Sequence, residues 1–336
     1  MSSAIRQRQA SPVRFVESTG SAVTFESFDL PATNQRFLDY PHPPNTQIPL
    51  ALRPSSDVTS LETAVSTIKN LQRDGTLTKL LARHGAILFR NLPIDDALAF
   101  SKFAHAFGYA PHEIIGIVVD RPLLAPNVAP ANEAPKEVQI YNHNESPQHT
   151  AGGSTLRQAF GKEIQDGDDE ETARKKIEAQ ILRYGRGENT TWEWKDFDDG
   201  KGLVLTHRLP VIRTQPGTNL PTLFSGLAAY HKYSINAQAA NGSAKADTVH
   251  QFFGDGTQIP EKYLARLVEI TEDIRVLHKW QQGDVLVFDN IIAQHGREPW
   301  QGEQSDRVVL ASLFDGENMP GAYGFGDWAQ VVRASD

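Results

Sequence analysis

The feature that most constrains the fold of this chain is a series of short apolar segments near its C-terminus. Residues 274–300 and 306–316 are rich in strand-forming residues and are joined by turns that contain Gly, Asp and Gln. The segment VLVF is apolar on both faces, which predicts a strand buried between two layers. Asp289-Asn290 then breaks the strand, and His295 follows at the head of a polar loop. We therefore expect the end of the chain to be built from short strands.

The rest of the chain shows helical and strand patterns. Apolar residues at helical spacing predict helices over residues 60–83, 95–108 (with Asp95 as its cap) and 259–274, and a charged surface helix over residues 161–187. Strands are predicted over residues 85–93, 138–146, 202–215 and 219–226, and a flexible loop over residues 240–248. An early α/β layer followed by late strands favours an α+β fold that is mainly β. The architecture we expect is a double-stranded β-helix, or jelly roll, with flanking helices.

Composition and local bias set the expected domain organisation and location. Residues 1–55 are rich in Pro, Ser and Asn and are expected to form an irregular arm, with room for one short strand, before a single domain over residues 56–336. The N-terminus has no apolar segment of the kind found in secretory signals. It is basic, contains Ser and has no acidic residue before Glu17, as in transit peptides, but we favour a disordered cytosolic tail. No apolar run approaches the ~20 residues that a membrane span requires. We therefore expect a cytoplasmic protein without a membrane partner.

Charge and cysteine content exclude several classes of function. The formal net charge of −8, without a run of Lys or Arg, argues against a nucleic-acid-binding protein. The chain contains no cysteine. Disulfides, zinc–thiolate sites, iron–sulfur clusters and a cysteine nucleophile are therefore all excluded.

One segment contains the only His-x-Glu or His-x-Asp pair in the chain. Residues 141–155 read YNHNESPQHTAGGST, with His143 and Glu145 two positions apart. A chain with 11 histidines and 41 acidic residues is expected to contain roughly one such pair by chance, so the pair alone decides nothing. A strand over residues 138–146 would place both side chains on the same face. This arrangement makes them candidates for metal ligands.

His295 supplies the third member of a possible ligand set. Two histidines and one carboxylate (His143, Glu145 and His295) match the facial triad that holds Fe(II) and leaves open positions for substrate oxygens and O₂. If 2-oxoglutarate is the co-substrate, its distal carboxylate requires a guanidinium, and Arg307 follows His295 by twelve residues. Each residue also has a simpler interpretation: His295 as a loop histidine without a role, and Arg307 as a solvated arginine paired with Asp306.

These segments together resemble a known family. GDVLVFDNIIAQHGREPW followed by DRVVLASLFDG resembles the C-terminal signature of the taurine dioxygenase-like family of Fe(II)/2-oxoglutarate-dependent oxygenases. YNHNES resembles its His-x-Asp/Glu segment, and HGAILFRNLPIDDALAFSKFAHAFG resembles its N-terminal strand–helix unit. With WEW and LTHRLPVIRTQPGTNLPTLFSG, the resemblance covers most of residues 80–316.

The resemblance implies roles for particular residues. His143, Glu145 and His295 would be the iron ligands, and Arg307 would bind the 2-oxoglutarate carboxylate. The implied reaction decarboxylates 2-oxoglutarate to succinate and CO₂ and oxidises an unactivated C–H bond of the substrate. In taurine-specific members a further arginine, one turn of strand beyond the 2-oxoglutarate arginine, holds the sulfonate. Here that position is Ala311, so a taurine-type substrate is not expected.

The chain also departs from the family directly after the His-x-Glu pair. Family members continue with a buried aromatic strand and a Gly-Gly-Glu-Thr-Pro-like turn, whose threonine contacts 2-oxoglutarate. Here only PQHTA separates HNES from GGSTLRQAFG. Either GGST is that turn and Thr155 is the contact, or several tens of residues are absent between Ser146 and Gly152. We favour the second alignment, which would reflect a genuine shortening or a mis-spliced gene.

Other polar residues are weaker candidates for substrate contacts. His112 lies where the family often places a substrate-contacting histidine, although a surface-turn histidine explains it as well. Asn142 either reaches substrate or caps its strand. His207, Arg208 and Arg213 either line the pocket or face solvent.

The sequence thus predicts an oxygenase that uses Fe(II), 2-oxoglutarate and O₂ on a small polar metabolite, such as an amino acid or a carboxylic acid. Hydroxylation, desaturation and oxidative cyclisation all remain open, and so does the oligomeric state, including a homo-oligomer. Two alternatives belong to other classes. One is a shortened, catalytically impaired relative that acts as a binding protein or is a non-functional gene product. The other is a hydrolytic or isomerising metal enzyme on a cupin-like barrel.

Overall fold

The computed structural model describes residues 25–55, 60–112, 123–131, 135–144, 160–161, 163–184, 189–197, 200–241, 251–316 and 319–324. Its helices are α1 (Leu61–Arg73), α2 (Thr76–His84), α3 (Ala97–His105), α5 (Glu170–Tyr184), α6 (Leu227–Asn241), α7 (Glu261–Ile274) and the 3₁₀ helix η2 (Gln304–Asp306). Within these ranges, no helix has the length and apolar character needed to cross a membrane.

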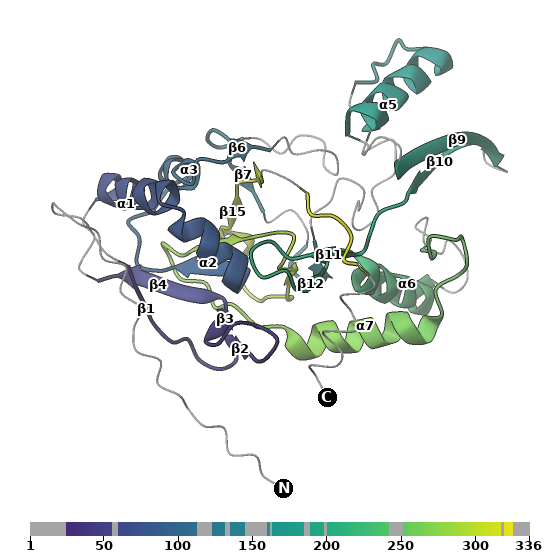
Figure 1. Ribbon diagram of the computed structural model, residues 1–336. Coiled ribbons are helices and arrows are strands. Elements are labelled where there is room, and N and C mark those ends of the chain that lie inside the picture. Colours follow the sequence, from purple (N-terminus) through teal and green to yellow (C-terminus); the bar gives the residue numbers. More distant parts are fainter. Residues whose placement is uncertain are drawn as a thin grey trace, which may run out of the picture.

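The strands are short, and they mix with the helices in an α+β structure (Figure 1). They are β1 (Phe25–Ser27), β2 (Arg36–Leu38), β3 (Thr46–Ile48), β4 (Leu50–Pro54), β5 (Ala86–Phe89), β6 (Ala110–Pro111), β7 (Ala129–Pro130), β8 (Ile140–His143), β9 (Thr190–Phe197), β10 (Gly200–His207), β11 (Ile212–Thr214), β12 (Pro221–Leu223), β13 (Val285–Phe288), β14 (His295–Arg297), β15 (Leu310–Ala311) and β16 (Phe314–Asp315).

A four-stranded sheet organises the main core. Its order is β1-β4-β5-β13, with β4 and β5 parallel and the other pairs antiparallel. All four residues of β5 are buried, as the apolar run AILF predicted. Apolar residues of α1, α2 and α3 pack against this sheet, and these helices gather at one side of the molecule (Figure 1). The rings of Phe25, Phe89, Phe103 and Phe107 meet edge to face, with centroids 5.2–6.1 Å apart.

The helix predicted over residues 60–83 is two helices. Asp74 ends α1, and Gly75 adopts a left-handed φ of 78° before α2 begins. The Asp74 carboxylate accepts a hydrogen bond from the Thr76 amide at 2.9 Å, so the Asp-Gly pair forms a turn. The prediction of Asp95 as the cap of the next helix was also wrong. Asp96 caps α3 by accepting from the Ala99 amide at 2.7 Å.

Two further segments differ from the prediction. Residues 1–55 were expected to hold at most one short strand, but the described part contains β1, β2, β3 and β4. Two of these, β1 and β4, belong to the main sheet because tertiary pairing overrides the weak local signal of a Pro-rich segment. The helix α6 was not predicted, since its apolar residues follow no helical period. The loop predicted over residues 240–248 lies outside the described residues beyond the last residues of α6.

The late strands pair with earlier strands that are distant in sequence. β14 pairs with β8, β15 with β7, and β16 with β6, all antiparallel. The pair β11–β12 corresponds to strands predicted in residues 202–215 and 219–226. The chain therefore returns at its C-terminal end to the middle segments, and this return brings the predicted site residues together.

A smaller hydrophobic cluster lies apart from the main core. Ile177 and Ile181 of α5 pack with Phe160 against Trp192, Trp194 and other apolar residues of the β9–β10 hairpin. The helix therefore buries one face, while half of its described residues are exposed, as expected for a charged surface helix. Figure 1 shows this helix–hairpin unit at the edge of the molecule, away from α1 and α2.

A buried ion pair fixes the turn that leads into β13. The Arg90 guanidinium donates two hydrogen bonds of 2.9 Å to Asp284, whose side chain is fully buried. His278 Nε2 lies 3.2 Å from the same carboxylate, and the Gln281 amide donates to it. Burial by itself raises the pKa of Asp284, but these hydrogen bonds outweigh burial and lower the pKa to about 2.

We predict that Asp284→Asn lowers the free energy of unfolding by about 2–4 kcal/mol at pH 7, because Arg90 is left without its charge partner. A carboxyl group whose pKa is lower in the folded than in the unfolded state stabilises the fold at pH values above its unfolded-state pKa. This stabilisation is lost as the pH falls through its folded-state pKa. The difference between wild type and variant should therefore shrink from about pH 4 towards pH 2 in urea unfolding. Glu269→Gln, at an exposed ion pair with Arg266, is the control. An equal loss in both variants would contradict the prediction.

Candidate metal site

The strands β8 and β14 bring two of the predicted ligands face to face. They pair antiparallel, and His295 lies directly opposite His143. The two imidazole rings have centroids 4.6 Å apart and planes inclined at 44°. His143 is buried and His295 is half-buried. The ring of Phe288, from the end of β13, lies 5.0 Å from the His295 ring and covers it with an apolar surface.

The orientation of the His143 ring is set by its own strand. Its Nδ1 lies 2.7 Å from the Tyr141 carbonyl oxygen. A carbonyl oxygen only accepts, so Nδ1 is the donor and the lone pair of the neutral ring is on Nε2. A backbone contact of this kind orients many metal-binding histidines. This contact thus fixes the tautomer of the His143 ring, in which Nε2 carries the lone pair that a metal would use.

The two histidines do not by themselves complete a metal site. Glu145, the predicted carboxylate ligand, and Thr155, the predicted 2-oxoglutarate contact, lie outside the described residues. Within the described part of the chain, no group of three or more His, Asp or Glu side chains is arranged to hold a metal ion. The structure therefore describes two of the three predicted ligands.

A glycine allows the two strands to approach closely. A Cβ atom on Gly296 would lie 2.5 Å from the Ile140 carbonyl oxygen and 2.8 Å from Oδ1 of Asn142. Ordinary contacts begin near 3.4 Å, so a larger side chain would push β14 away from β8. The pairing also shifts register between His295 and Arg297, which is typical of a β-bulge.

The turn before β14 contains a buried carboxyl group. Asp289 accepts a hydrogen bond of 2.8 Å from the Ile291 amide, and its own amide donates to Gly85. Burial raises the pKa of Asp289, although the bond from Ile291 opposes this effect. These contacts hold residues 289–293 against the main core, so the position of the first residue of β14 is fixed relative to that core.

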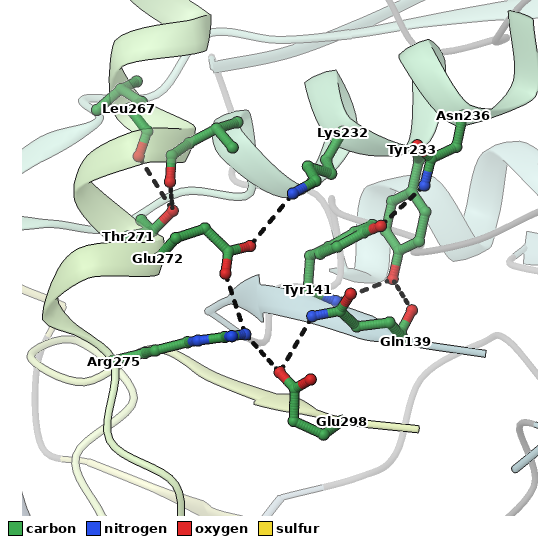
Figure 2. A network of polar contacts seen from close by, with 11 residues as sticks. Gln139, Tyr141, Lys232, Tyr233, Asn236, Leu267, Thr271, Glu272, Arg275 and Glu298 are labelled. Carbon is green, nitrogen blue, oxygen red and sulfur yellow. Dashed lines mark hydrogen bonds and ion pairs between the residues drawn. The ribbon is translucent and has the colours of Figure 1, made fainter. Parts of the chain in front are cut away.

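A network of polar contacts supports β8 and β14 from outside the site (Figure 2). The Tyr141 amide donates to the Tyr233 hydroxyl at 3.2 Å, and the Tyr141 hydroxyl accepts from Asn236 at 2.8 Å. These contacts tie β8 to α6. Burial raises the pKa of the Tyr233 hydroxyl.

The same network reaches α7 and the end of β14. Arg275 forms ion pairs with Glu272 and Glu298, and Glu298 also accepts from the Gln139 amide group at 3.1 Å. Lys232 of α6 pairs with Glu272 at 3.4 Å. Figure 2 shows these side chains converging beside β8. Both histidine-bearing strands are therefore attached to the α6–α7 pair.

Two arginines contribute positive charge near the paired strands. Arg297 of β14 donates to the carbonyl oxygens of Pro135 and Val138, just before β8. Arg307 is half-buried after η2, and its pKa is lowered by burial and then by the positive charge of Arg297. Arg307 is thus a partly desolvated cation next to a second positive charge, and an anion beside it would offset both effects.

The structure places the weaker candidates at several positions. His112 Nδ1 lies 2.7 Å from the Asp315 carboxylate where β6 pairs with β16. Asn142 lies on β8 against Gly296. His207 contacts the Thr190 hydroxyl at 3.0 Å, and Arg208 is exposed. Arg213 is buried, donates to the Pro320 carbonyl oxygen and stacks over Phe224.

Sequence reasoning missed several residues that shape this site. Gly296 and Arg297 directly follow His295, but neither was selected because glycine and arginine are common in polar loops. Asn144 was also passed over, although it lies between the two predicted ligands. No sequence signal indicated Tyr233 or Asn236, since α6 itself was not predicted.

Comparisons with known proteins agree with this geometry. Residues 169–312 match the family described as "Taurine catabolism dioxygenase TauD, TfdA family". The chain is 27% identical over 322 residues to a clavaminate synthase-like protein of Arabidopsis thaliana, covering 81% of this chain and 91% of the relative. It is 23% identical over 299 residues to the dapdiamide synthesis protein DdaC of Enterobacter agglomerans, covering 76% and 91%.

These matches show that a segment of the chain, residues 169–312, is similar to the TauD/TfdA dioxygenase family. The predicted resemblance to the taurine dioxygenase-like family is therefore confirmed. His295 and Arg307 lie inside the matched residues, whereas His143, Glu145 and Thr155 precede them. The first alignment also spans 322 positions while covering 81% of 336 residues. Some residues of the relative thus have no counterpart in this chain.

We predict that Gly296→Ala weakens metal binding, because its Cβ would force β14 away from β8 and separate the two imidazoles. Titration with Co(II), followed by visible absorption, should show at least about a tenfold loss of affinity. Gly254→Ala is the control, since a Cβ at that position meets nothing within 4 Å. Equal affinities of the two variants would show that the close approach at Gly296 does not matter for the site.

Proposed function

We propose that this protein is an Fe(II)- and 2-oxoglutarate-dependent oxygenase built on a double-stranded β-helix. The observation that carries the proposal is the pairing of His143 with His295 across β8 and β14, with ring centroids 4.6 Å apart. The match of residues 169–312 to the TauD/TfdA family supports the same activity. The pairing of late strands with middle strands supports the proposed architecture.

The residues present suit a ferrous ion. His143 and His295 offer imidazole nitrogens, and Glu145, two residues after His143, is the proposed carboxylate ligand. Imidazole and carboxylate ligands are typical of mononuclear iron oxygenases, in which bound iron couples the decarboxylation of 2-oxoglutarate by O₂ to the oxidation of a C–H bond. In this chain, the Tyr141 carbonyl would hold the His143 ring in place, and Phe288 would exclude water from one side of His295.

Arg307 is the proposed partner of the 2-oxoglutarate carboxylate. Its pKa is lowered by burial and then by the positive charge of the Arg297 guanidinium. A bound carboxylate would offset both burial and repulsion, and a planar guanidinium binds it through two hydrogen bonds. Thr155 is the proposed second contact to the co-substrate.

The proposed substrate is a small polar metabolite, such as an amino acid or a carboxylic acid, in the cytoplasm. His112 and Asn142 are the proposed substrate contacts. The names of the two relatives, which refer to clavaminate synthase and to dapdiamide synthesis, support a small-molecule substrate. Ala311, which replaces the sulfonate-binding arginine of taurine-specific members, supports a substrate other than taurine.

We predict that His143→Ala and His295→Ala each abolish iron-dependent formation of succinate from 2-oxoglutarate, because each removes one imidazole donor. Succinate is measured by chromatography after incubation with Fe(II), ascorbate and air. His105→Asn, on α3 where the ring contacts Ser101, is the control and should retain activity. Unchanged turnover in either site variant would overturn the assignment.

One alternative is favoured by a specific observation. The alignment positions that have no counterpart in this chain fit a shortened relative that binds ligands but does not catalyse, or a non-functional gene product. Comparing genomic DNA with the transcript around codons 146–152 shows whether the shortening is genuine.

We predict that anaerobic addition of Fe(II) and 2-oxoglutarate to the full chain produces the weak visible absorption band of the iron–keto-acid chelate. Arg307→Lys should raise the 2-oxoglutarate concentration at half-saturation by about tenfold, because lysine lacks the bidentate fork. Arg266→Lys, at an exposed ion pair, is the matched control. Absence of the band in the wild-type chain would favour the non-catalytic alternative.

A further inference from the structure

Asn144, between the two proposed ligands of the His-x-Glu pair, makes contacts that neither the sequence nor the family match assigns to a role. Its side chain is completely buried, with 0% exposure. Its neighbour His143 is the last residue of β8. The position of Asn144 is therefore fixed by the same strand that carries one of the facing imidazoles.

The Asn144 amide group uses its full hydrogen-bonding capacity. Its Nδ2 donates to the Asn290 carbonyl oxygen at 2.6 Å and to the Ala293 carbonyl oxygen at 3.4 Å. Its Oδ1 accepts from the Ser225 amide at 2.8 Å and from the Gln294 side chain at 3.2 Å. A primary amide has two N–H donors and two acceptor lone pairs, so four partners satisfy it.

Three of these partners belong to the turn that leads directly into His295. Asn290, Ala293 and Gln294 immediately precede β14, and the fourth partner, Ser225, connects β12 to α6. Gln294 also donates to the Ser225 carbonyl oxygen at 2.7 Å, which closes the network. One side chain thus ties the end of β8 to the start of β14 and to the base of α6.

We propose that Asn144 is a positioning residue that fixes the distance and orientation of His143 relative to His295. The four side-chain hydrogen bonds of Asn144 go to the turn that carries His295 and to Ser225, so the residue acts through that turn. Its effect on imidazole spacing stands independently of the bound metal, whereas its effect on metal affinity rests on the proposed function. Outer partners of metal ligands commonly change affinity by about 10–100-fold.

A matched pair of substitutions separates this role from a general loss of stability. Asn144→Asp replaces the Nδ2 amide group, which donates two hydrogen bonds, with a carboxylate oxygen. That oxygen would face the carbonyl oxygens of Asn290 and Ala293 and could only accept. Asn34→Asp makes the same chemical change at another buried asparagine, which donates to the Leu277 carbonyl oxygen. Gln294→Met is a milder variant that removes the Gln294 bonds to Asn144 and to the Ser225 carbonyl oxygen and leaves the other three contacts of Asn144.

The first measurement does not depend on metal. The chain contains no cysteine, so His143→Cys/His295→Cys creates a single cross-strand thiol pair. Directly opposed residues have Cα atoms within disulfide range. With oxidised glutathione as oxidant, we expect Asn144→Asp to slow disulfide formation at least about fivefold and Gln294→Met to slow it less. Asn34→Asp should leave the rate unchanged. Equal rates in the Asn144→Asp and Asn34→Asp backgrounds would overturn the proposal. If Asn144→Asp does not fold, the rate in the Gln294→Met background is compared with that in Asn34→Asp, and equal rates there overturn it.

The second measurement uses the native histidines and Co(II) alone, titrated by calorimetry. Asn144→Asp should weaken binding by at least about tenfold relative to both wild type and Asn34→Asp. If wild type binds Co(II), unchanged affinity in Asn144→Asp counts against the proposal. If wild type binds no metal while the disulfide rates differ as expected, the proposed iron site fails and the positioning role of Asn144 stands.

Discussion

The antiparallel pairing of β8 with β14 is the contact on which the candidate site depends. It places His143 opposite His295, although the two residues lie in distant parts of the chain. Several features converge on it: Gly296 permits the close approach, Asn144 ties the strand ends together, and the Tyr141–Tyr233 contact anchors β8 to α6. A site assembled from two strands requires this support, because a small relative shift would separate the two proposed ligands.

The sequence predicted one juxtaposition in the candidate site, that of His143 and His295, and part of the fold. His143 and His295 were predicted as partners because imidazoles at those positions matched a known ligand pattern, and the structure brings them together. The strands β5 and β13 were visible as compact apolar runs. In contrast, β1 and β4 gave no clear signal, since their stability comes from pairing with distant residues rather than from local preference.

The errors also have physical causes. A turn of two residues, Asp74-Gly75, divided a segment whose apolar spacing continued across the break. The helix α6 carries polar and apolar residues on all sides, so its helical period was invisible, yet it supplies Tyr233 and Asn236 to the support of β8. Hydrogen-bonded positions such as Asn144 depend on tertiary neighbours, and no local pattern reveals them.

The order of strands in the main sheet has a consequence for how the chain folds during synthesis. β5 pairs on one side with β4, which precedes it closely, and on the other with β13, in which Val285 lies opposite Phe89. Until β13 has left the ribosome, the buried residues of β5 present an unpaired edge to solvent. Such an edge is prone to pairing with other chains. Truncated products that end before Val285 are therefore expected to aggregate, and completion of the core and assembly of the histidine pair become late, linked events in folding.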